Sequence, residues 1–172
     1  TAKIEVEVVS FSLFSNFPYA SVEFKNIKAG EAKGFVTTGT VMNAKSLSLL
    51  FNLASMFSDH YRLKKIVLRD ASLNLQVDED GNVNYVIWNS DTTKDIAFQL
   101  ELQSVDFQNV NVLYYNASKN QDISFFIDEG SLSGDFGSDN YQLTTDGILE
   151  NTTVIVDNIS YLTETNCELQ LS

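Results

Sequence analysis

The chain has 172 residues and a formal net charge of −12, and 44% of its residues are hydrophobic while 20% are charged. This balance predicts a globular chain with a core rather than a disordered one. The excess of acidic residues excludes nucleic acid as a partner, because that binding depends on neutralising phosphates with basic residues.

The charges are distributed unevenly along the chain. Residues 1–69 hold nine basic and five acidic residues, a net charge of +4, whereas residues 70–172 hold two basic and eighteen acidic residues, a net charge of −16. A basic first third would suit a position beside an anionic membrane surface. An ordinary solvated surface explains the same asymmetry and is the preferred explanation on charge alone.

Most of the chain has the composition and the alternation of β-strands. Several strand-like stretches share one irregularity: two apolar residues two positions apart are followed by an apolar or small residue three positions further on. The stretches with this three-residue step are 22–27, 66–73, 105–112, 125–132 and 154–161, and residues 4–13 have a similar step.

Such a step would move the apolar residues to the opposite face of a regular strand, because successive side chains point to opposite faces. A β-bulge inserts one residue, returns the side chains to the same face and bends the strand. Asn and Asp tolerate the backbone angles of such a site. We therefore predict bulges near Asn26, Asp70 and Asn109, in a curved sheet with one apolar concave face.

One segment departs from the β pattern. Leu50, Leu53, Ala54 and Phe57 have helical spacing, which predicts a short amphipathic helix over residues 50–59 at one end of the sheet. Turns are expected at Asp80-Gly81, at 117–121, at 134–140 and at Asp146-Gly147. The predicted fold class is mainly β: an elongated, curved antiparallel sheet with bulged strands and one short helix.

The run KSLSLLFNLASMFSDHYRLKKIVLRDASLNLQVDEDGNVNY, residues 45–85, resembles the AsmA family of bacterial envelope proteins. The resemblance is carried by the Leu-rich segment, the I-x-L-x-D-A-x-L-x-L strand and the D-x-D-G-N-x-N turn. The earlier segment VSFSLFSNFPYASVEFKNIKAGE looks like the N-terminal hairpin of the family. We expect residues 1–172 to form a single β-rich domain, in which 1–90 are the AsmA-like N-terminal part and 91–172 add further strands.

The resemblance implies a non-catalytic periplasmic module that is anchored to the inner membrane by a helix upstream of this chain. Such modules contribute to an apolar groove for phospholipid acyl chains, in phospholipid transport or outer-membrane biogenesis. Because the chain begins at Thr1 rather than at a methionine, we expect it to be a fragment of a longer protein. The residues expected to face lipid are Val22, Phe24, Ile66, Leu68, Leu73 and Leu75.

A structural or protein-interaction β domain of the cell envelope, without lipid binding, is the alternative. The two hypotheses differ in whether the concave apolar face is left uncovered, because soluble monomers rarely expose a large contiguous apolar patch.

Residue types that support catalysis or metal binding are sparse. Asp78, Asp80 and Asn82 surround Gly81 as in a calcium loop, but the EF-hand spacing and its final glutamate are missing, so a turn is the preferred explanation. His60 is the only histidine and Cys167 the only cysteine, which leaves no acid–base pair and no intramolecular disulfide. We expect no enzymatic activity, no metal site and no cofactor.

Overall fold

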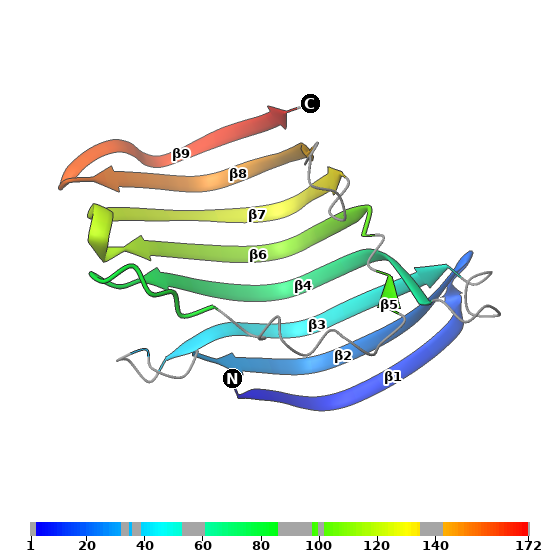
Figure 1. Cartoon of the computed structure of the whole chain (residues 1–172). Helices are drawn as coiled ribbons and strands as arrows, with labels where there is room; N and C mark the ends of the chain where they lie inside the picture. Colours follow the sequence, from blue (N-terminus) through cyan, green and yellow to red (C-terminus); the bar gives the residue numbers. More distant parts are fainter. Residues whose placement is uncertain are drawn as a thin grey trace.

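The structure is a computed structural model, and it describes residues 3–31, 35, 39–52, 61–85, 98–99, 102–134 and 143–171. These residues are almost entirely β-strand (Figure 1), which confirms the predicted mainly β fold. The elements are β1 (Ile4–Asn16), β2 (Tyr19–Gly30), β3 (Thr40–Asn52), β4 (Tyr61–Val77), β5 (Phe98–Gln99), β6 (Ser104–Asn116), the 3-10 turn η3 (Ala117–Lys119), β7 (Gln121–Gly134), β8 (Leu143–Val156) and β9 (Ile159–Leu171).

The long strands form one sheet in the order β1-β2-β3-β4-β6-β7-β8-β9, with β5 paired to β4 off this path. Neighbouring strands pair antiparallel except β4 and β6, which run parallel with Lys65 opposite Ser104 and Val77 opposite Asn116. The short strand β5 also pairs parallel with β4, so the predicted antiparallel sheet is wrong at these two pairs. A parallel pair requires a long connection back to the same end of the sheet, and residues 78–103 make that connection.

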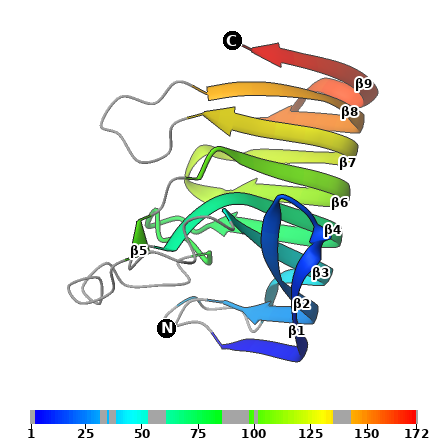
Figure 2. The same cartoon turned by 90° about the vertical axis from the view of Figure 1, so that its right-hand side faces the viewer.

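The described strands form a single layer. Each long strand contacts its hydrogen-bonded neighbours, and no second sheet of described residues packs on either face. Figure 2 shows that the strands bend, so that the sheet forms a trough that opens on the side of β5. The edge strands β1 and β9 are each paired on one side only within the described part of the chain.

The bend uses the predicted three-residue step, but in an unexpected form. Two consecutive inner rows are Val6–Ile27–Ala44–Ala71–Val110 and Val9–Phe24–Leu47–Leu68–Phe107. The register is the same in both rows, whereas a bulge in one strand would shift it against the neighbouring strand. Strands β1, β2, β3, β4, β6 and β7 all take their extra residue at the same level, so they bend together and stay in register.

The predicted bulge positions are therefore correct in place and wrong in kind. Asn26, Asp70 and Asn109 have positive φ angles of 52°, 49° and 57°, the left-handed conformation that Asn and Asp accept more readily than other non-glycine residues. The apolar residues two positions before and one position after each of them belong to the same face, as the step predicts: Phe24 and Ile27, Leu68 and Ala71, Phe107 and Val110.

Beyond β7 the bend is displaced along the strands. The register shifts between β7 and β8 near Ile127/Gly130, and between β8 and β9 near Leu149/Thr152. Asn151 in β8 and Glu164 in β9 have positive φ angles of 50° and 48°. The bend in these strands therefore moves along the sheet from one strand to the next.

The structure corrects one predicted step and one predicted turn. The step predicted at 154–161 is a hairpin turn between β8 and β9, since Asp157 and Asn158 both have positive φ, as a two-residue hairpin loop requires. Asp146-Gly147 is no turn but lies within β8, where Gly147 is opposite Gly130. A Cβ on Gly147 would stand 3.1 Å from the Cα of Gly130, so close packing between two strands explains this glycine.

The predicted helix is wrong at its start. Residues 50–52 belong to β3, where Leu50 is opposite Lys65 and Phe51 is opposite Leu63. Strand pairing overrides the helical spacing there, because the alternation of residues 46–50 fits the pleated sheet equally well. Residues 53–60, which carry the rest of the predicted helix and His60, lie outside the described residues.

Candidate functional site

The inner face of the bend carries the hydrophobic core. Leu68 and Ala71 lie on either side of Asp70 and belong to one cluster, which confirms that the apolar face is continuous through the step. Val110, at the centre of the sheet, is fully buried. The buried members are Ile27, Ala44, Leu68, Ala71, Val110, Val112 and Ile127, and half-buried Phe24, Met42, Leu47, Leu73, Phe107, Phe125 and Leu149 pack against them.

The structure brings the six predicted lipid-facing residues onto this inner face. Val22 is opposite Leu49, which is opposite Ile66, and the row next to it contains Phe24, Leu47 and Leu68. Leu73 and Leu75 lie beyond the bend on β4, on the same face by alternation. Leu68 is buried, whereas the other five are half-buried and retain exposed apolar surface.

A hollow of about 260 Å³ opens on the inner face next to the core. Gly130 and Gly147 are opposite each other in β7 and β8 and leave space where other strands carry large side chains. Its apolar wall consists of Leu73, Phe107, Val112, Phe125, Ile127, Leu132, Leu149 and Leu169. The hollow is smaller than the roughly 300–1,000 Å³ of pockets that enclose a whole small ligand. It could hold part of an apolar chain.

Of the residues that line this hollow, only Leu73 was among the predicted site residues. The three-residue step already contained the signal for Phe107, Val112, Phe125 and Ile127, since they stand at the apolar positions of the stretches 105–112 and 125–132. Gly147 could not be found in this way, because an Asp-Gly pair is typical of a turn.

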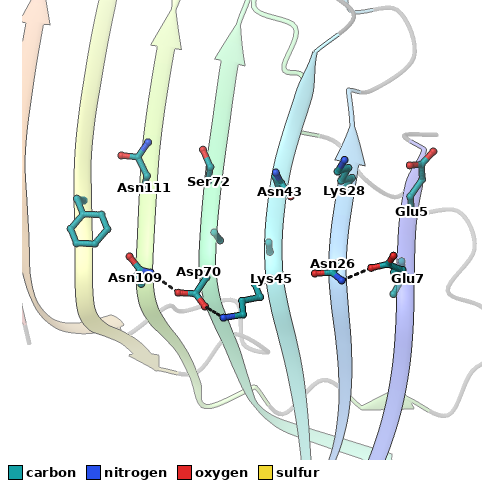
Figure 3. A pocket seen from close by; sticks show the side chains of 14 residues that line it. Glu5, Glu7, Asn26, Lys28, Asn43, Lys45, Asp70, Ser72, Asn109 and Asn111 are labelled. Atoms are coloured by element: carbon teal, nitrogen blue, oxygen red, sulfur yellow. Dashed lines mark hydrogen bonds and ion pairs between the residues drawn. The ribbon is translucent and has the colours of Figure 1, made fainter.

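The outer face of the bend is polar. One row crosses five strands at the level of the positive φ angles and consists of Glu7, Asn26, Lys45, Asp70 and Asn109 (Figure 3). We call it the bend row. Lys45 Nζ lies 3.3 Å from Asp70 Oδ2, Asn109 donates a hydrogen bond to Asp70, and Asn26 donates one to Glu7. The bend residues therefore also link neighbouring strands.

These contacts change the electrostatics of one carboxyl group. The hydrogen bond from the Asn109 amide, followed by that from Lys45, lowers the pKa of Asp70 below its ordinary value. A groove of about 890 Å³ runs over the outer face beside the bend row, and Asn43, Ser72 and Asn111 stand on its far side. Its lining mixes charged and amide side chains with apolar ones such as Val6 and Phe126.

The parallel pair of β4 and β6 is bridged by side chains on the same outer face. Lys65 Nζ is 2.6 Å from Asp106 Oδ2, and Arg69 Nε donates to Gln108 Oε1 at 2.6 Å. Together with the bond from Asn109 to Asp70, these contacts link the only described long strands that pair parallel.

The acidic turn after β4 is held by its own hydrogen bonds. Asp78 accepts bonds from the backbone N–H and the side-chain amide of Asn82, both at 2.8 Å, while Asp80 is exposed. The bonds from Asn82 lower the pKa of Asp78. Within the described ranges, no three His, Cys, Asp or Glu side chains gather as a metal site would require.

A scan of the chain against models of protein families and a search of curated proteins both find no match. Among the residues that the structure describes, no helix is long and apolar enough to cross a membrane.

Proposed function

We propose that this chain is a non-catalytic module of the bacterial cell envelope whose apolar trough accommodates phospholipid acyl chains, as its resemblance to the AsmA family implies. In the full-length protein the module would be periplasmic and anchored to the inner membrane by an upstream helix. Its role would be in phospholipid transport or outer-membrane biogenesis. Lipid is the only ligand that the proposal requires.

The observation that carries the proposal is one apolar face that runs across the whole sheet without a second layer of described residues. Its partly exposed members reach the edge strand β1, where Val9 is 61% and Phe11 56% exposed. Monomeric soluble proteins seldom leave such contiguous apolar surface in water. Acyl chains are ligands of matching chemistry, because they need no hydrogen-bonding partner.

A purely structural or protein-interaction domain remains the second candidate, and one observation favours it. Val110 is 0% and Leu68 5% exposed, which is typical of an ordinary core. If the whole inner face behaved in this way, a charge placed on it would unfold the protein and lipid would be irrelevant.

The test is a charge on the inner face beside the hollow, with a matched charge on the outer face. Leu73→Asp places an unpaired carboxylate where an acyl chain would lie, and desolvating it costs several kcal/mol, well over a tenfold loss of binding. Ser72→Asp is the control, because Ser72 is exposed on the opposite face of the same strand. We expect Leu73→Asp to lose crosslinking to a photoactivatable phosphatidylethanolamine while Ser72→Asp keeps it, with both melting like the parent chain.

A folded Leu73→Asp protein that crosslinks as well as the parent would exclude the trough as the lipid site. Gross unfolding of Leu73→Asp would place this residue in a structural core. In that event Leu75→Asp, which lies outside the buried cluster, repeats the test further from the bend. Loss of fold in both variants would favour the structural candidate.

A further inference from the structure

The edge strand β1 exposes an unusual amount of apolar surface. Its inner-face residues Ile4, Val6, Val9 and Phe11 are 50%, 38%, 61% and 56% exposed. The strand pairs with β2, and no described strand pairs with its other edge. Sheets usually protect a long edge with charges, prolines or bulges, since an unprotected edge invites pairing with another chain.

The backbone of β1 presents its inner-face residues to this open edge. The N–H of Gly30 donates to the carbonyl of Lys3 at 2.8 Å, so Lys3 is bonded to β2. Opposite residues in an antiparallel pair alternate between bonded and non-bonded pairs, so the amides of Ile4 and Val6 point away from β2. In a strand, the face on which a side chain lies also determines the direction of that residue's backbone amide. Val9 and Phe11 share the face of Ile4 and Val6, so their amides also point away from β2.

We propose that β1 is a dimerisation edge, on which the chain pairs antiparallel with β1 of a second copy around a two-fold axis between Glu7 and Val8. In this register Val6 is opposite Val9 of the second copy, and Ile4 is opposite Phe11. Each of these pairs brings together two residues whose amides point outward, as a hydrogen-bonded pair requires. The inner faces of the two copies then join in one continuous trough.

The three-residue step is the reason why a second copy fits this edge. A strand added to β1 must bend at the level of Val6 and Val9, or the register breaks as it does between β7 and β8. In the proposed pairing the step from Val6 to Val9 is opposite the same step running backwards. The pair β1–β2 shows the same match, with Val6 opposite Ile27 and Val9 opposite Phe24.

The free edge of β9 fits less well. Its inner row places exposed Thr165 at the bend, and the bend of β9 is displaced relative to that of the first strands. Pairing of β9 with β1 of another copy would also be heterologous and would build an open polymer, whereas the β1–β1 contact closes as a dimer. The isologous contact is therefore the one that we infer.

One interaction on the outer face opposes the proposed dimer. Glu5 would be opposite Ser10 and Glu7 opposite Val8, so no like charges are directly opposite. The two Glu7 side chains, however, lie next to the axis and repel each other when ionised. Glu7→Gln removes this repulsion and is expected to tighten the dimer.

Sedimentation velocity of the 172-residue chain across a wide range of concentration tests the proposal. We expect a monomer–dimer equilibrium that Val9→Lys shifts to monomer and Glu7→Gln shifts to dimer. Val8→Lys is the comparison, because it places the same charge on the outer face, where it is opposite Glu7 of the second copy and should keep or tighten the dimer. A strictly monomeric parent chain, a growing polymer, or a dimer that survives Val9→Lys would overturn the proposal.

Disulfide formation tests the register in a Cys167→Ser background. A mixture of Val6→Cys and Val9→Cys proteins should crosslink, because opposite residues of a strand pair lie within the Cα separation that a disulfide allows. Val6→Cys alone should not crosslink efficiently, since two copies of residue 6 are not opposite each other. Equal crosslinking in both samples would exclude this register. This test is independent of lipid binding, so its outcome can be separated from that of the acyl-chain proposal.

Discussion

Asn84 completes an edge that the strand order leaves open. Pairing between β3 and β4 reaches only to Met42 and Leu73, so the last residues of β4 have no partner in β3. The fully buried Asn84 side chain accepts a hydrogen bond from the Gln76 N–H at 2.9 Å and donates one to the Asn74 carbonyl at 3.0 Å. The D-x-D-G-N-x-N motif therefore returns the chain to the edge of β4.

Replacing Asn84 by alanine should lower the free energy of unfolding by about 1–3 kcal/mol, because it leaves a buried N–H and a buried carbonyl without partners. Asp80→Ala is the comparison within the same turn. Asp80 is exposed, so we expect a change below about 0.5 kcal/mol. Urea denaturation of both variants measures the difference. Equal stability of the two variants would mean that water replaces the Asn84 amide. A urea midpoint that rises with calcium in the parent chain, but not in Asp80→Ala, would reveal a metal site in the turn.

The pKa of Asp70 gives a second test at the level of one side chain. Asn109→Gly keeps a residue that accepts the positive φ angle and removes only the amide, the main cause of the lowered pKa. We expect the pKa of Asp70 to rise toward its ordinary value, as measured by carboxyl 13C chemical shifts. In the parent chain the carboxylate contributes stability above the ordinary pKa, and this contribution is lost as the pH falls through the lowered pKa. An unchanged titration in Asn109→Gly would show that Lys45 alone sets the pKa.

At the level of strands, the sequence pattern identifies where the sheet bends but not how neighbouring bends are related. The steps at Asn26, Asp70 and Asn109 are visible because apolar spacing reports which face a side chain occupies. Whether one strand bulges against its neighbour depends on a second strand far away in the sequence. The aligned bend therefore appears only when the register is known.

The same reasoning explains the other differences from the sequence-based predictions. The parallel pairing of β4 with β6 depends on where a long connection leads, and local propensity carries no information about that. Gly147 serves strand packing in β8 while its neighbour Asp146 makes the pair look like a turn. Predicted inner-face residues such as Phe24 and Leu73 were found because alternation alone determines the face.

The left-handed conformation at the bend predicts a difference between two substitutions of Asn26. Glycine accepts a φ of 52° without strain, whereas valine, which is branched at Cβ, is a poor fit there. Both variants lose the side-chain hydrogen bond to Glu7. The difference between their free energies of unfolding therefore reports the cost of the backbone conformation alone. We expect Asn26→Val to be less stable than Asn26→Gly by at least about 1–2 kcal/mol, as measured by the urea midpoint. Equal midpoints would mean that the bend does not require this conformation.

For the whole molecule, the single layer determines the size of the trough. Eight strands with a spacing of about 4.8 Å give a length of about 34 Å across the sheet. The hydrocarbon core of a bilayer is about 30 Å thick, so one leaflet's acyl chains need about half of that length. The trough of one copy is therefore long enough for acyl chains, and a β1–β1 dimer would double it.

The strand order also turns the charge asymmetry of the sequence into a spatial one. The order follows the chain from β1 to β9, with residues 1–69 on the β1 side and the acidic remainder on the β9 side. The basic excess of the first part comes mainly from Lys45 in β3 and from Arg62, Lys64, Lys65 and Arg69 in β4, so the middle of the sheet is more basic than the β9 end.

The parallel pairing of β4 and β6 has a consequence for how the chain reaches its native state. Strands β1 to β4 form one meander and β6 to β9 another, each made of antiparallel neighbours in sequence. The pair that joins them brings together residues such as Arg69 and Gln108, which are 39 positions apart. Contacts between distant residues form late, because loop closure costs entropy before the contact contributes. Each meander should therefore fold as a unit of its own, and docking of β6 along β4 should complete the native sheet as the final kinetic step.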